Sequence, residues 1–540
     1  MNGLHEFLTP LDWIVAFACL LFTSLVGYCL RGRQADTADF FLGGRSLPWP
    51  AVTGSLIAAE IGAVTFLVVP GSVLALRGDF TYLQWAIGSL LARVVVGCWF
   101  VKVFYEKDTY SPYDFIGRRL GEGGKRFATV LFLAGSVLPQ CVRLLVAVLV
   151  LRAITPLPFE WCLVGVGGIA VGWTLLGGMR TVIWTDVVQL GLFVAGGLTA
   201  LWWLVDGFAE GWETLFSVAR SSESFDGTVT DKMRLWNFDL SPELRFTFWV
   251  AVFAVPFLHL HAFGVDQRNA QRLFCCRDAG GARKAVIWSS IGQFATALLL
   301  LVGAALHVFY VRQPPTDPLV MNALRWSGGE PLVPEMVFPV WIVTELPAAA
   351  RGLLLAGIFA AAVSSLDSIL AALSQTTLSW MRRIDREDAK PGRKKPLRLA
   401  RLLVLGWGVV LIGLTYGLFA IAENTRIPVR PSASGWIHYT AGPLLGIFLV
   451  ALFGKGRGSV KGLFLGTLLS FLLVLFVRTD FWDLVMDDSL AAWMAQLPGY
   501  ERVEGMSDTV KPTVATAWMW PVTTLLTAGL GWILGGKKPK

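Results

Sequence analysis

Residues Arg351–Trp380 read RGLLLAGIFAAAVSSLDSILAALSQTTLSW. The stretch is long and apolar enough to cross a bilayer as one helix, because about 20 apolar residues span the hydrocarbon core. It nevertheless carries Ser364, Ser365, Asp367 and Ser368 near its middle. A carboxylate at that depth costs at least about 2.5–3.5 kcal/mol, so an ionisable residue inside a membrane indicates a functional site.

Three of these polar residues share one face of the predicted helix. Ser364, Asp367 and Ser368 are three and four positions apart, which brings their side chains together. Hydroxyl and carboxylate oxygens suit a hard cation such as sodium, which we expect to take oxygen ligands as calcium and magnesium do. The serines alone would equally suit close helix packing, where small and hydroxyl residues hydrogen-bond between helices. Asp367 favours the cation site, because packing needs no charge.

The composition is that of a polytopic membrane protein. The chain has 540 residues, of which 55% are hydrophobic and 16% charged, and its mean hydropathy is +0.60. The net charge of +8 does not indicate nucleic-acid binding, because most basic residues lie in the connections between hydrophobic segments. The seven cysteines show neither a paired framework nor metal-ligand spacing. We therefore expect a cell-membrane protein without a cofactor, a nucleic-acid partner or an obligatory protein partner, surrounded by lipid.

Hydropathy predicts an all-α protein with about thirteen transmembrane helices. They run near 11–30, 47–76, 82–104, 127–153, 159–177, 181–204, 246–264, 285–311, 352–380, 399–422, 437–453, 459–477 and 515–535. The first is expected to be a retained helix rather than a signal peptide, since no basic region precedes it and no small-residue cleavage site follows. Alternate connections hold about twice as many Lys and Arg as the others, which predicts an external N-terminus and a cytoplasmic C-terminus. The segments 205–245, 312–351 and 478–514 would then lie outside the cell.

Two further spans contain an acidic residue at least one turn from their ends. The second contains small residues together with Glu60 and Pro70, which predicts a broken helix whose freed carbonyls can bind a cation. A simple proline kink is the alternative. Asp186 lies about one turn into the sixth span. An acid in that place also fits a helix start, where it meets the positive end of the helix dipole.

Five motifs occur in order along the chain: FLGGRSL at 41–47, a run from Gly178 through Trp184-Thr185-Asp186 to Gln189, Asp266-Gln267 with Gln271-Arg272, AGIFAAAVSSLDS at 356–368 and GPLLGIF at 442–448. Together they resemble the sodium:solute symporter family, over about residues 37–475. The resemblance implies one transporter domain, 1–540, with the LeuT-like fold of two five-helix inverted repeats whose first and sixth core helices are broken. The repeats would occupy 47–204 and 246–453, with an extra helix at 11–30 and two helices within 459–535.

The resemblance also implies sodium as the coupling ion. The family's main sodium site, built from carbonyls of the first core helix and groups of the eighth, falls on Ala58, Ile61, Ala361, Ser364 and Ser365. Some members have a second sodium site, which falls on Asp186, Ser364 and Ser368. Asp367 is either a ligand of that second ion or only its neighbour.

The family's substrate contacts fall on Glu60, Gly62, Thr65, Gln84, Arg143, His259 and Gln293. Arg143 matches an arginine that binds the carboxylate in sialic-acid-type members, and arginine suits two-pronged carboxylate recognition. A structural ion pair between Arg143 and Glu60 is the alternative, and His259 also fits an interior histidine. Glu60 departs from the neutral polar residue expected at its position.

The sequence therefore predicts a sodium-coupled importer of a small organic solute. A carboxylate such as a sialic or other organic acid is the favoured substrate, and a sugar of the glucose or galactose type or a polyol is the alternative. A polytopic membrane enzyme is not favoured, because the predicted loops contain no paired catalytic motif, metal cluster or phosphate loop. Only a few residues follow the last predicted span, so a sensor with a signalling module is not expected either.

Overall fold

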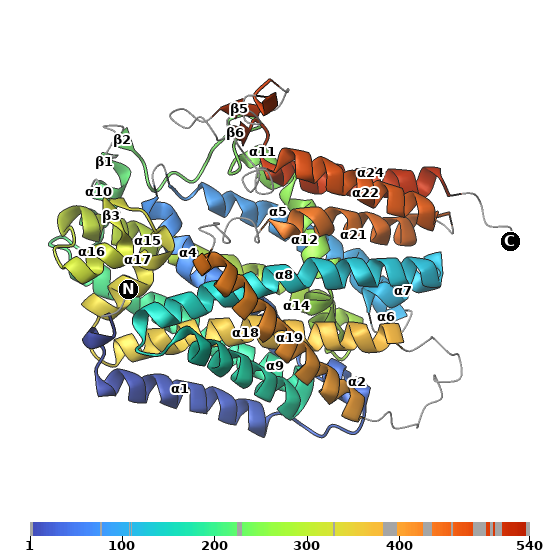
Figure 1. Cartoon of the computed structure of the whole chain (residues 1–540), viewed down its shortest axis with the longest axis horizontal. Coiled ribbons are helices and arrows are strands. Elements are labelled where there is room, and N and C mark those ends of the chain that lie inside the picture. Colours follow the sequence, from blue (N-terminus) through green and yellow to red (C-terminus); the bar gives the residue numbers. More distant parts are fainter. Residues whose placement is uncertain are drawn as a thin grey trace.

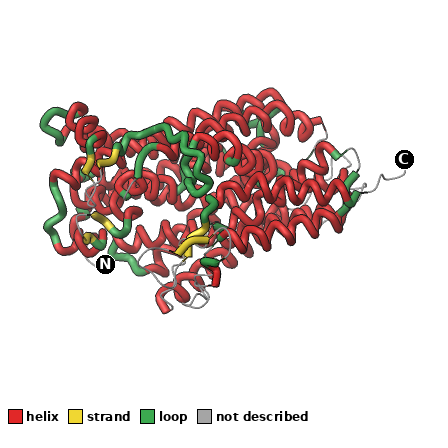
Figure 2. Tube along the Cα trace, turned by 90° about the horizontal axis from the view of Figure 1, so that it is seen from above, coloured by secondary structure: helices red, strands yellow, loops and turns green. Residues whose placement is uncertain are grey.

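The computed structural model describes residues 4–75, 78–106, 109, 111–223, 229–327, 330–381, 397–424, 435–454, 457–478, 493–496, 500–502 and 510–535. Helices dominate the described chain, as Figure 2 shows. Strands within these ranges form three two-stranded antiparallel hairpins, β1–β2, β3–β4 and β5–β6. Most of the predicted external segment 478–514, the basic connection 382–396 and the basic C-terminal tail lie outside the described residues.

The first half of the chain contains, in order, η1 Leu4–Phe7, α1 Pro10–Cys29, α2 Thr37–Leu42, η2 Gly43–Arg45, α3 Trp49–Glu60, α4 Ala63–Leu74, η3 Thr81–Gln84, α5 Trp85–Val95, η4 Val96–Phe100, α6 Val101–Glu106, α7 Pro112–Leu120, α8 Glu122–Ile154, α9 Phe159–Asp206, α10 Trp212–Arg220, β1 Ser222–Glu223 and β2 Val229–Thr230. The second half contains α11 Phe248–Phe253, α12 Val255–Leu260, η5 His261–Val265, α13 Gln267–Phe274, α14 Ala279–Trp288, η6 Ser289–Ile291, α15 Gly292–Arg312, α16 Pro318–Leu324, β3 Trp326–Ser327, β4 Glu330–Pro331, α17 Pro334–Glu345, α18 Ala350–Met381, α19 Leu397–Asn424, α21 Trp436–Phe453, α22 Val460–Val477, β5 Tyr500–Arg502, β6 Val510–Pro512, η9 Thr516–Trp518 and α24 Met519–Ile533.

Ten helices of the described chain are long and apolar enough to cross a membrane. Three places account for the difference from the thirteen predicted spans. The span 47–76 is divided between α3 and α4, the spans 159–177 and 181–204 form the single kinked helix α9, and the last span contains the 15-residue α24. The polytopic helical fold is confirmed, and the count of thirteen stays a prediction.

Gly178 explains the kink in α9. Its φ of 53° and ψ of −144° interrupt the helix between the two predicted spans. A Cβ atom at this position would lie 2.0 Å from the carbonyl oxygen of Phe40, so the turn requires a residue that has no side chain and tolerates positive φ. The kink therefore separates the two predicted spans and allows α2 to pack closely against α9.

The stretch Arg351–Trp380 lies within α18, which is deeply buried among other helices. It packs against α9, α1, α8 and α19, and Figure 1 shows this group in the lower half of the view, with α21, α22 and α24 together along the upper edge. Small residues such as Ala360 and Ala361 are fully buried and allow these helices to approach closely. The helix predicted to carry the site is therefore the most deeply buried of the ten.

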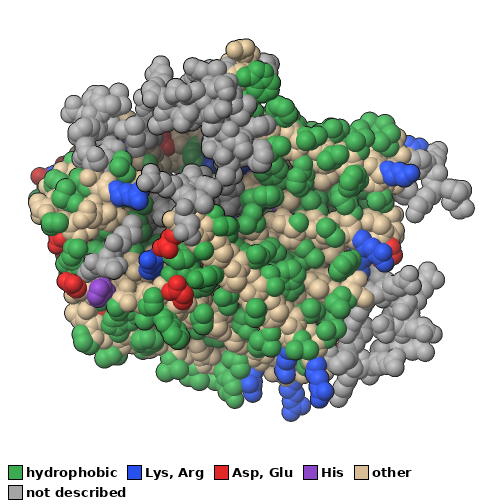
Figure 3. Space-filling view, in the orientation of Figure 1, with side chains coloured by type: hydrophobic (Ala, Val, Ile, Leu, Met, Phe, Trp, Pro, Cys, Tyr) green, Lys and Arg blue, Asp and Glu red, His purple; other side chains and the backbone are tan. Residues whose placement is uncertain are grey.

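Hydrophobic side chains face outward on the peripheral helices. Leu21 and Phe22 of α1, Phe464 of α22 and Leu525 of α24 are all exposed. In Figure 3, such side chains cover the middle of the visible face, and Lys and Arg gather mainly toward its right-hand and lower edges. Extended apolar surface of this kind marks contact with a membrane.

Candidate functional site

The second predicted span is broken between α3 and α4. Ile61 and Gly62 leave helical geometry, with φ/ψ values of −88°/64° and −77°/179°. A Cβ atom on Gly62 would lie 2.7 Å from Ser365 Oγ, so the break meets α18 where the chain has no side chain. Pro70 lies inside regular α4. The predicted broken helix is confirmed, and a proline kink is not what interrupts the span.

The break leaves backbone oxygens available to a cation. The last four carbonyls of a helix lack partners within it, and among the described residues no hydrogen bond reaches the carbonyl oxygens of Ala58 and Ile61. On α18, Ser365 Oγ donates to the carbonyl oxygen of Ala361 at 3.2 Å. Ser364 and Ser365 both line the cavity that contains the break. The structure therefore brings the predicted main sodium ligands of α3 and α18 to one region.

The residues predicted for a second sodium ion also converge, around Asp186 of α9. Asp186 Oδ1 accepts a 2.5 Å hydrogen bond from Ser364 Oγ, and Oδ2 accepts one of 2.5 Å from Ser55 Oγ of α3. The geometry differs from the prediction in one respect, because Oδ2 also accepts a 2.9 Å bond from Arg272 Nη2. The same nitrogen bonds Ser368 Oγ. Asp186 is therefore a buried ion-pair partner that lies well beyond a helix start.

Arg272 belongs to one of the five motifs, but its sequence position did not predict this pairing with Asp186. The short helix α13 carries it inside the protein, where two glutamines of the same helix hold α13 in place. Gln271 Nε2 donates to the carbonyl oxygen of Phe41 at 2.8 Å, and Gln267 Nε2 donates to Gln375 Oε1 of α18 at 2.8 Å. Two amides four residues apart on an eight-residue helix were the available signal that this connection is buried.

Asp367 lies beside this cluster. Its Oδ1 accepts a 3.1 Å hydrogen bond from Ser368 Oγ, and its carbonyl oxygen accepts one of 3.5 Å from Thr174 Oγ1 of α9. Its Oδ2 is buried and has no hydrogen-bond partner among the described residues. In this arrangement Asp367 is bonded to one member of the Asp186 cluster and to none of the α3 residues in it.

Glu60, the last residue of α3, is paired with an arginine that sequence analysis did not identify. Arg93 Nη2 lies 2.5 Å from Glu60 Oε2, and the arginine side chain is fully buried. Arg93 Nη1 donates to Ser289 Oγ at 2.8 Å, and Gln293 Nε2 donates to Glu60 Oε1 at 3.2 Å. The proposed pair between Glu60 and Arg143 is therefore wrong, because Glu60 finds its partner on α5.

His259 joins the same polar cluster. Its Nδ1 lies 3.0 Å from Ser89 Oγ, which accepts a 3.1 Å hydrogen bond from Arg93 Nε. The Arg93 guanidinium also lies 4.2 Å from the centre of the Phe263 ring, a cation–π contact. Glu60, His259 and Gln293 are thus brought together, with Arg93 as the residue that joins them.

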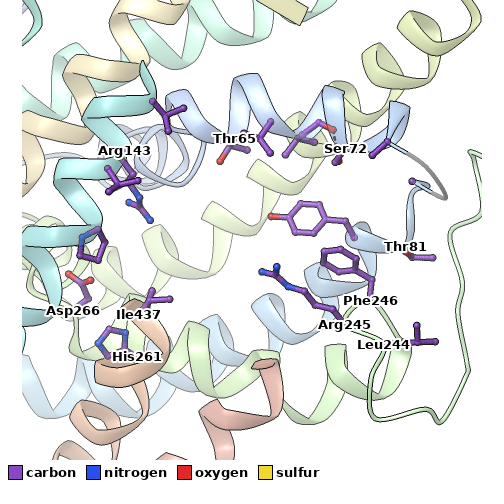
Figure 4. A pocket seen from close by; sticks show the side chains of 18 of the residues that line it. Thr65, Ser72, Thr81, Arg143, Leu244, Arg245, Phe246, His261, Asp266 and Ile437 are labelled. Atoms are coloured by element: carbon purple, nitrogen blue, oxygen red, sulfur yellow. Dashed lines mark hydrogen bonds between the residues drawn. The ribbon is translucent and has the colours of Figure 1, made fainter. Parts of the chain in front are cut away.

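Arg143 of α8 lacks such a partner. Among the described residues it makes no hydrogen bond and no ion pair, although it lies in the middle of a buried helix. Figure 4 shows its guanidinium directed into a cavity, into which Arg245 also points from another side. A lone Arg at membrane depth is costly and normally has a partner. The partner of Arg143 is absent from the described protein.

Two adjoining cavities share Arg143. The inner one, of about 240 Å³, includes Glu60, Gly62, Thr65 and His259 in its lining. The outer one, of about 990 Å³, shares Thr65 and Arg143 with it and extends to Arg245 and Phe246. Five of the seven predicted substrate residues therefore line the inner cavity.

The other two predicted substrate residues lie outside both cavities. Gln293 is connected to the site, among the described residues, by its bond to Glu60. Gln84 is buried, donates to the carbonyl oxygen of Phe246 at 3.3 Å, and accepts from the backbone of Asn237 at 3.3 Å. Gln84 thus fixes the chain that precedes α11, and a direct substrate contact has no support from its position.

A neighbouring ion pair lies next to Arg143. Asp266 caps α13 by accepting from the backbone nitrogen of Arg268 at 2.9 Å, and its carboxylate also bonds the Arg268 guanidinium, with Nε at 3.0 Å from Oδ1. Burial raises the pKa of Asp266, but the positive charge and hydrogen bonds of Arg268 outweigh it and hold the pKa below its usual range. Asp266 and Arg268 therefore neutralise each other, and Arg143 keeps an uncompensated charge.

Comparison with known proteins gives the family. The model of the sodium:solute symporter family matches residues 40–469. The human sodium/iodide cotransporter is 27% identical over 78% of this chain. The match covers 62% of that relative, so this chain spans less than two thirds of the relative's length. The sodium/sialic acid symporter of Proteus mirabilis (strain HI4320) is 26% identical, over 88% of this chain and 90% of the relative. Relatives of similar identity include human sodium-coupled monocarboxylate transporter 1 and a sodium/glucose cotransporter of Vibrio parahaemolyticus.

A solved structure shows the same fold. A Na⁺-coupled sialic acid symporter, in a substrate-bound outward-open state, superposes with a TM-score of 0.74 over 97% of both chains, at 21% identity. The expected LeuT-like fold is thereby confirmed. The relatives are transporters, which also confirms that the chain is not classed with enzymes. The family match covers most of the sequence and includes all five motifs. The chain therefore belongs to the sodium:solute symporter family.

Proposed function

We propose that this chain couples sodium movement to the uptake of a small organic anion, with a carboxylate as the group that is recognised. The observation that carries the proposal is Arg143, a cation that has no partner among the described residues and lines both cavities. Because an isolated charge is expensive to bury, a bound anion supplies the missing partner. An arginine offers two parallel donors, which match a carboxylate.

The charges around Arg143 favour an anion over a neutral solute. Glu60 is compensated by Arg93, Asp266 by Arg268, and Asp186 by Arg272. What remains in the inner cavity is the positive charge of Arg143. The relatives named for iodide, sialic acid and monocarboxylates all take anions, which supports the same substrate class for this chain.

A neutral sugar is the second candidate. Thr65, His259 and Asn269 line the inner cavity with uncharged hydrogen-bonding groups, which suit hydroxyl groups as well as carboxylates. One relative is named a sodium/glucose cotransporter. The sugar leaves Arg143 unpaired, and this is why we rank it second.

The coupling sodium binds, in our proposal, between the broken helix and α18. Its ligands are the carbonyl oxygens of Ala58, Ile61 and Ala361 and the hydroxyls of Ser364 and Ser365. Oxygen-only ligands suit a hard cation, and unwound backbone inside a membrane fits a cation site. This sodium site is distinct from the second predicted cation site, at Asp186, Ser364, Asp367 and Ser368.

The orientation and repeat boundaries are also proposals. The repeats occupy 47–204 and 246–453, and an external N-terminus places α13 and the right-hand end of Figure 3 on the cytoplasmic side, where Lys and Arg gather. Substrate then enters through the outer cavity and reaches the inner one from outside the cell. Lipid surrounds the helices, and no further protein is needed for this scheme.

A binding screen tests the substrate class. The purified protein is heated with sugars, polyols and small carboxylates, each in sodium and in potassium chloride, and the midpoint of unfolding is recorded. A ligand that binds only the folded state raises this midpoint. We expect acids to stabilise the protein in sodium and not in potassium. Stabilisation by neutral sugars alone would replace the anion by the second candidate, and equal stabilisation in both salts would contradict sodium coupling.

A further inference from the structure

The guanidinium of Arg272 occupies the centre of the Asp186 cluster. Its Nε donates to Ser55 Oγ at 2.7 Å, and its Nη2 donates to Asp186 Oδ2 at 2.9 Å and bonds Ser368 Oγ. Nη1 donates to the carbonyl oxygen of Arg268 at 3.2 Å. The side chains of Arg272 and Asp186 are both fully buried, and the partners come from α3, α9, α13 and α18.

These partners are the groups that a metal cation would use. Nη2 is bonded to a carboxylate oxygen and a hydroxyl oxygen, and a second hydroxyl, Ser364 Oγ, reaches the other oxygen of the same carboxylate. Oxygen atoms around one positive charge are the environment that a hard cation prefers. The negative charge of Asp186 is already balanced by Arg272. Hydroxyl groups from α3 (Ser55) and α18 (Ser368) bond the same guanidinium.

We propose that Arg272 is the built-in cation of this second site, so that the carrier binds one sodium ion, at the broken helix, and none at Asp186. The inference rests on the proposed sodium coupling and fixes its stoichiometry. The sequence motif alone predicts sodium at Asp186, whereas the structure places a covalently attached positive charge there.

Electrostatics makes the two cations mutually exclusive. Two unit positive charges about 4 Å apart, at an effective dielectric constant of about 20, repel strongly enough to weaken binding by about a thousandfold. A sodium ion on Asp186 would have to lie about that close to the guanidinium, because both would share one carboxylate. Sodium binds at Asp186 only after Arg272 has left or has lost its charge.

Counting bound sodium tests the proposal without any substrate. Radioactive sodium is titrated to saturation against the purified full-length protein, and ions bound per chain are counted. We expect one ion for the parent. Arg272→Gln removes the charge and keeps hydrogen-bonding capacity, so it is expected to bind two. Arg272→Lys keeps the positive charge and is expected to bind one.

Lys125→Gln is the matched control. Lys125 is a buried cation whose Nζ lies 2.9 Å from Asp114 Oδ1, in a cluster of α7 and α8 that contains no predicted sodium ligand. Its removal is expected to leave one sodium ion per chain. An arginine with a purely structural role would likewise leave the count unchanged, so a change specific to Arg272→Gln separates the two roles.

The parent measurement decides the proposal even if Arg272→Gln does not fold. Two ions bound by the parent would overturn it and leave sodium coupling intact. One ion bound by folded Arg272→Gln would also overturn it, because removing the charge of Arg272 would then not allow sodium to bind at Asp186. No sodium bound by the parent would instead contradict the proposed sodium coupling itself.

Discussion

Arg93 of α5 forms a 2.5 Å ion pair with Glu60, the residue at which α3 ends. The pair fixes the inner end of the broken helix to a neighbouring helix, and Gln293 and Ser289 complete its hydrogen bonds. Because these bonds hold Glu60 in place, they also set the direction in which the following carbonyls and Gly62 face α18. The cation region and the substrate cavity therefore share one anchoring contact.

Removing Arg93 should destabilise the protein strongly. Arg93→Gln leaves Glu60 without its counter-charge, and breaking a buried pair costs about 3–5 kcal/mol. Glu60 is 25% exposed, so we expect the lower end of that range. Glu60→Gln combined with Arg93→Gln should recover much of the loss in a double-mutant cycle followed by thermal unfolding. Lys102→Gln, which removes an exposed pair with Glu106, serves as control and should cost at most about 1 kcal/mol.

Ser365→Ala should abolish the stabilisation of the folded protein by sodium. The substitution deletes a predicted ligand, and alanine is a better helix former, so α18 should still fold. Sodium at about one hundred times its dissociation constant stabilises the parent by about 2.7 kcal/mol, which is readily seen as a shift in unfolding temperature. Ser374→Ala, about 13 Å further along the same helix, is the control and should keep the shift. A normal sodium shift in Ser365→Ala would show that the ligand set is wrong.

Gly62→Ala should weaken sodium binding by widening the gap at the break. Its Cβ would lie 2.7 Å from Ser365 Oγ, so either α18 or the backbone of the break must move. Gly172→Ala is the matched control, since a Cβ there meets no heavy atom within 4 Å, and it should raise stability by up to about 1 kcal/mol. Sodium titrations followed by unfolding temperature compare the two variants. Equal sodium affinity in Gly62→Ala and the parent would contradict a site at the break.

Asp186→Asn should cost about 3–5 kcal/mol of stability, because it leaves Arg272 as a buried charge without a partner. An acid that only favoured a helix start would cost a few tenths of a kcal/mol. Arg272→Met combined with Asp186→Asn removes both charges and should restore much of the stability. Denaturant or thermal unfolding of the parent and these two variants distinguishes a buried ion pair from an acid at a helix start, and a loss below about 1 kcal/mol in Asp186→Asn would rule out a strong pair.

Sequence patterns predicted the features that depend on local spacing. The shared face of Ser364, Asp367 and Ser368 follows from helix periodicity, and a break within the second span follows from its small residues, its acid and its proline. These properties are set by neighbours in the chain, so a single sequence contains them. The place of the break, at Ile61 and Gly62, comes from the structure.

Pairings between distant residues were not predictable in the same way. Glu60 and Arg93 are 33 positions apart, and Asp186 and Arg272 are 86 positions apart. Several arginines compete for each buried acid, and only the packing of α5 and α13 decides between them. This is why Arg143 was a plausible partner for Glu60 in the sequence, whereas it has no partner within the part of the chain that the structure describes.

Arg143 provides the sharpest test of the substrate class. With no partner among the described residues, Arg143→Gln should not destabilise the ligand-free protein, in contrast to Arg93→Gln. Removing an uncompensated charge from a cavity wall is expected to be neutral or slightly stabilising. A loss of several kcal/mol in ligand-free Arg143→Gln would instead reveal a structural role.

Binding then separates an anion from a neutral solute. Arg143→Lys keeps the positive charge but not the two parallel donors, so affinity for an acid should fall by about 1.5–3 kcal/mol, the range for a hydrogen bond to a charged group. The best acid from the screen and its amide or alcohol analogue are titrated calorimetrically, in sodium, into the parent and Arg143→Lys proteins. We expect the parent to prefer the acid and the lysine variant to lose most of that preference, because the carboxylate alone uses the guanidinium fork. Equal affinity of the parent for the acid and its neutral analogue would end the carboxylate assignment. The unpaired charge of Arg143 would then face a neutral solute, and the sugar would become the better substrate.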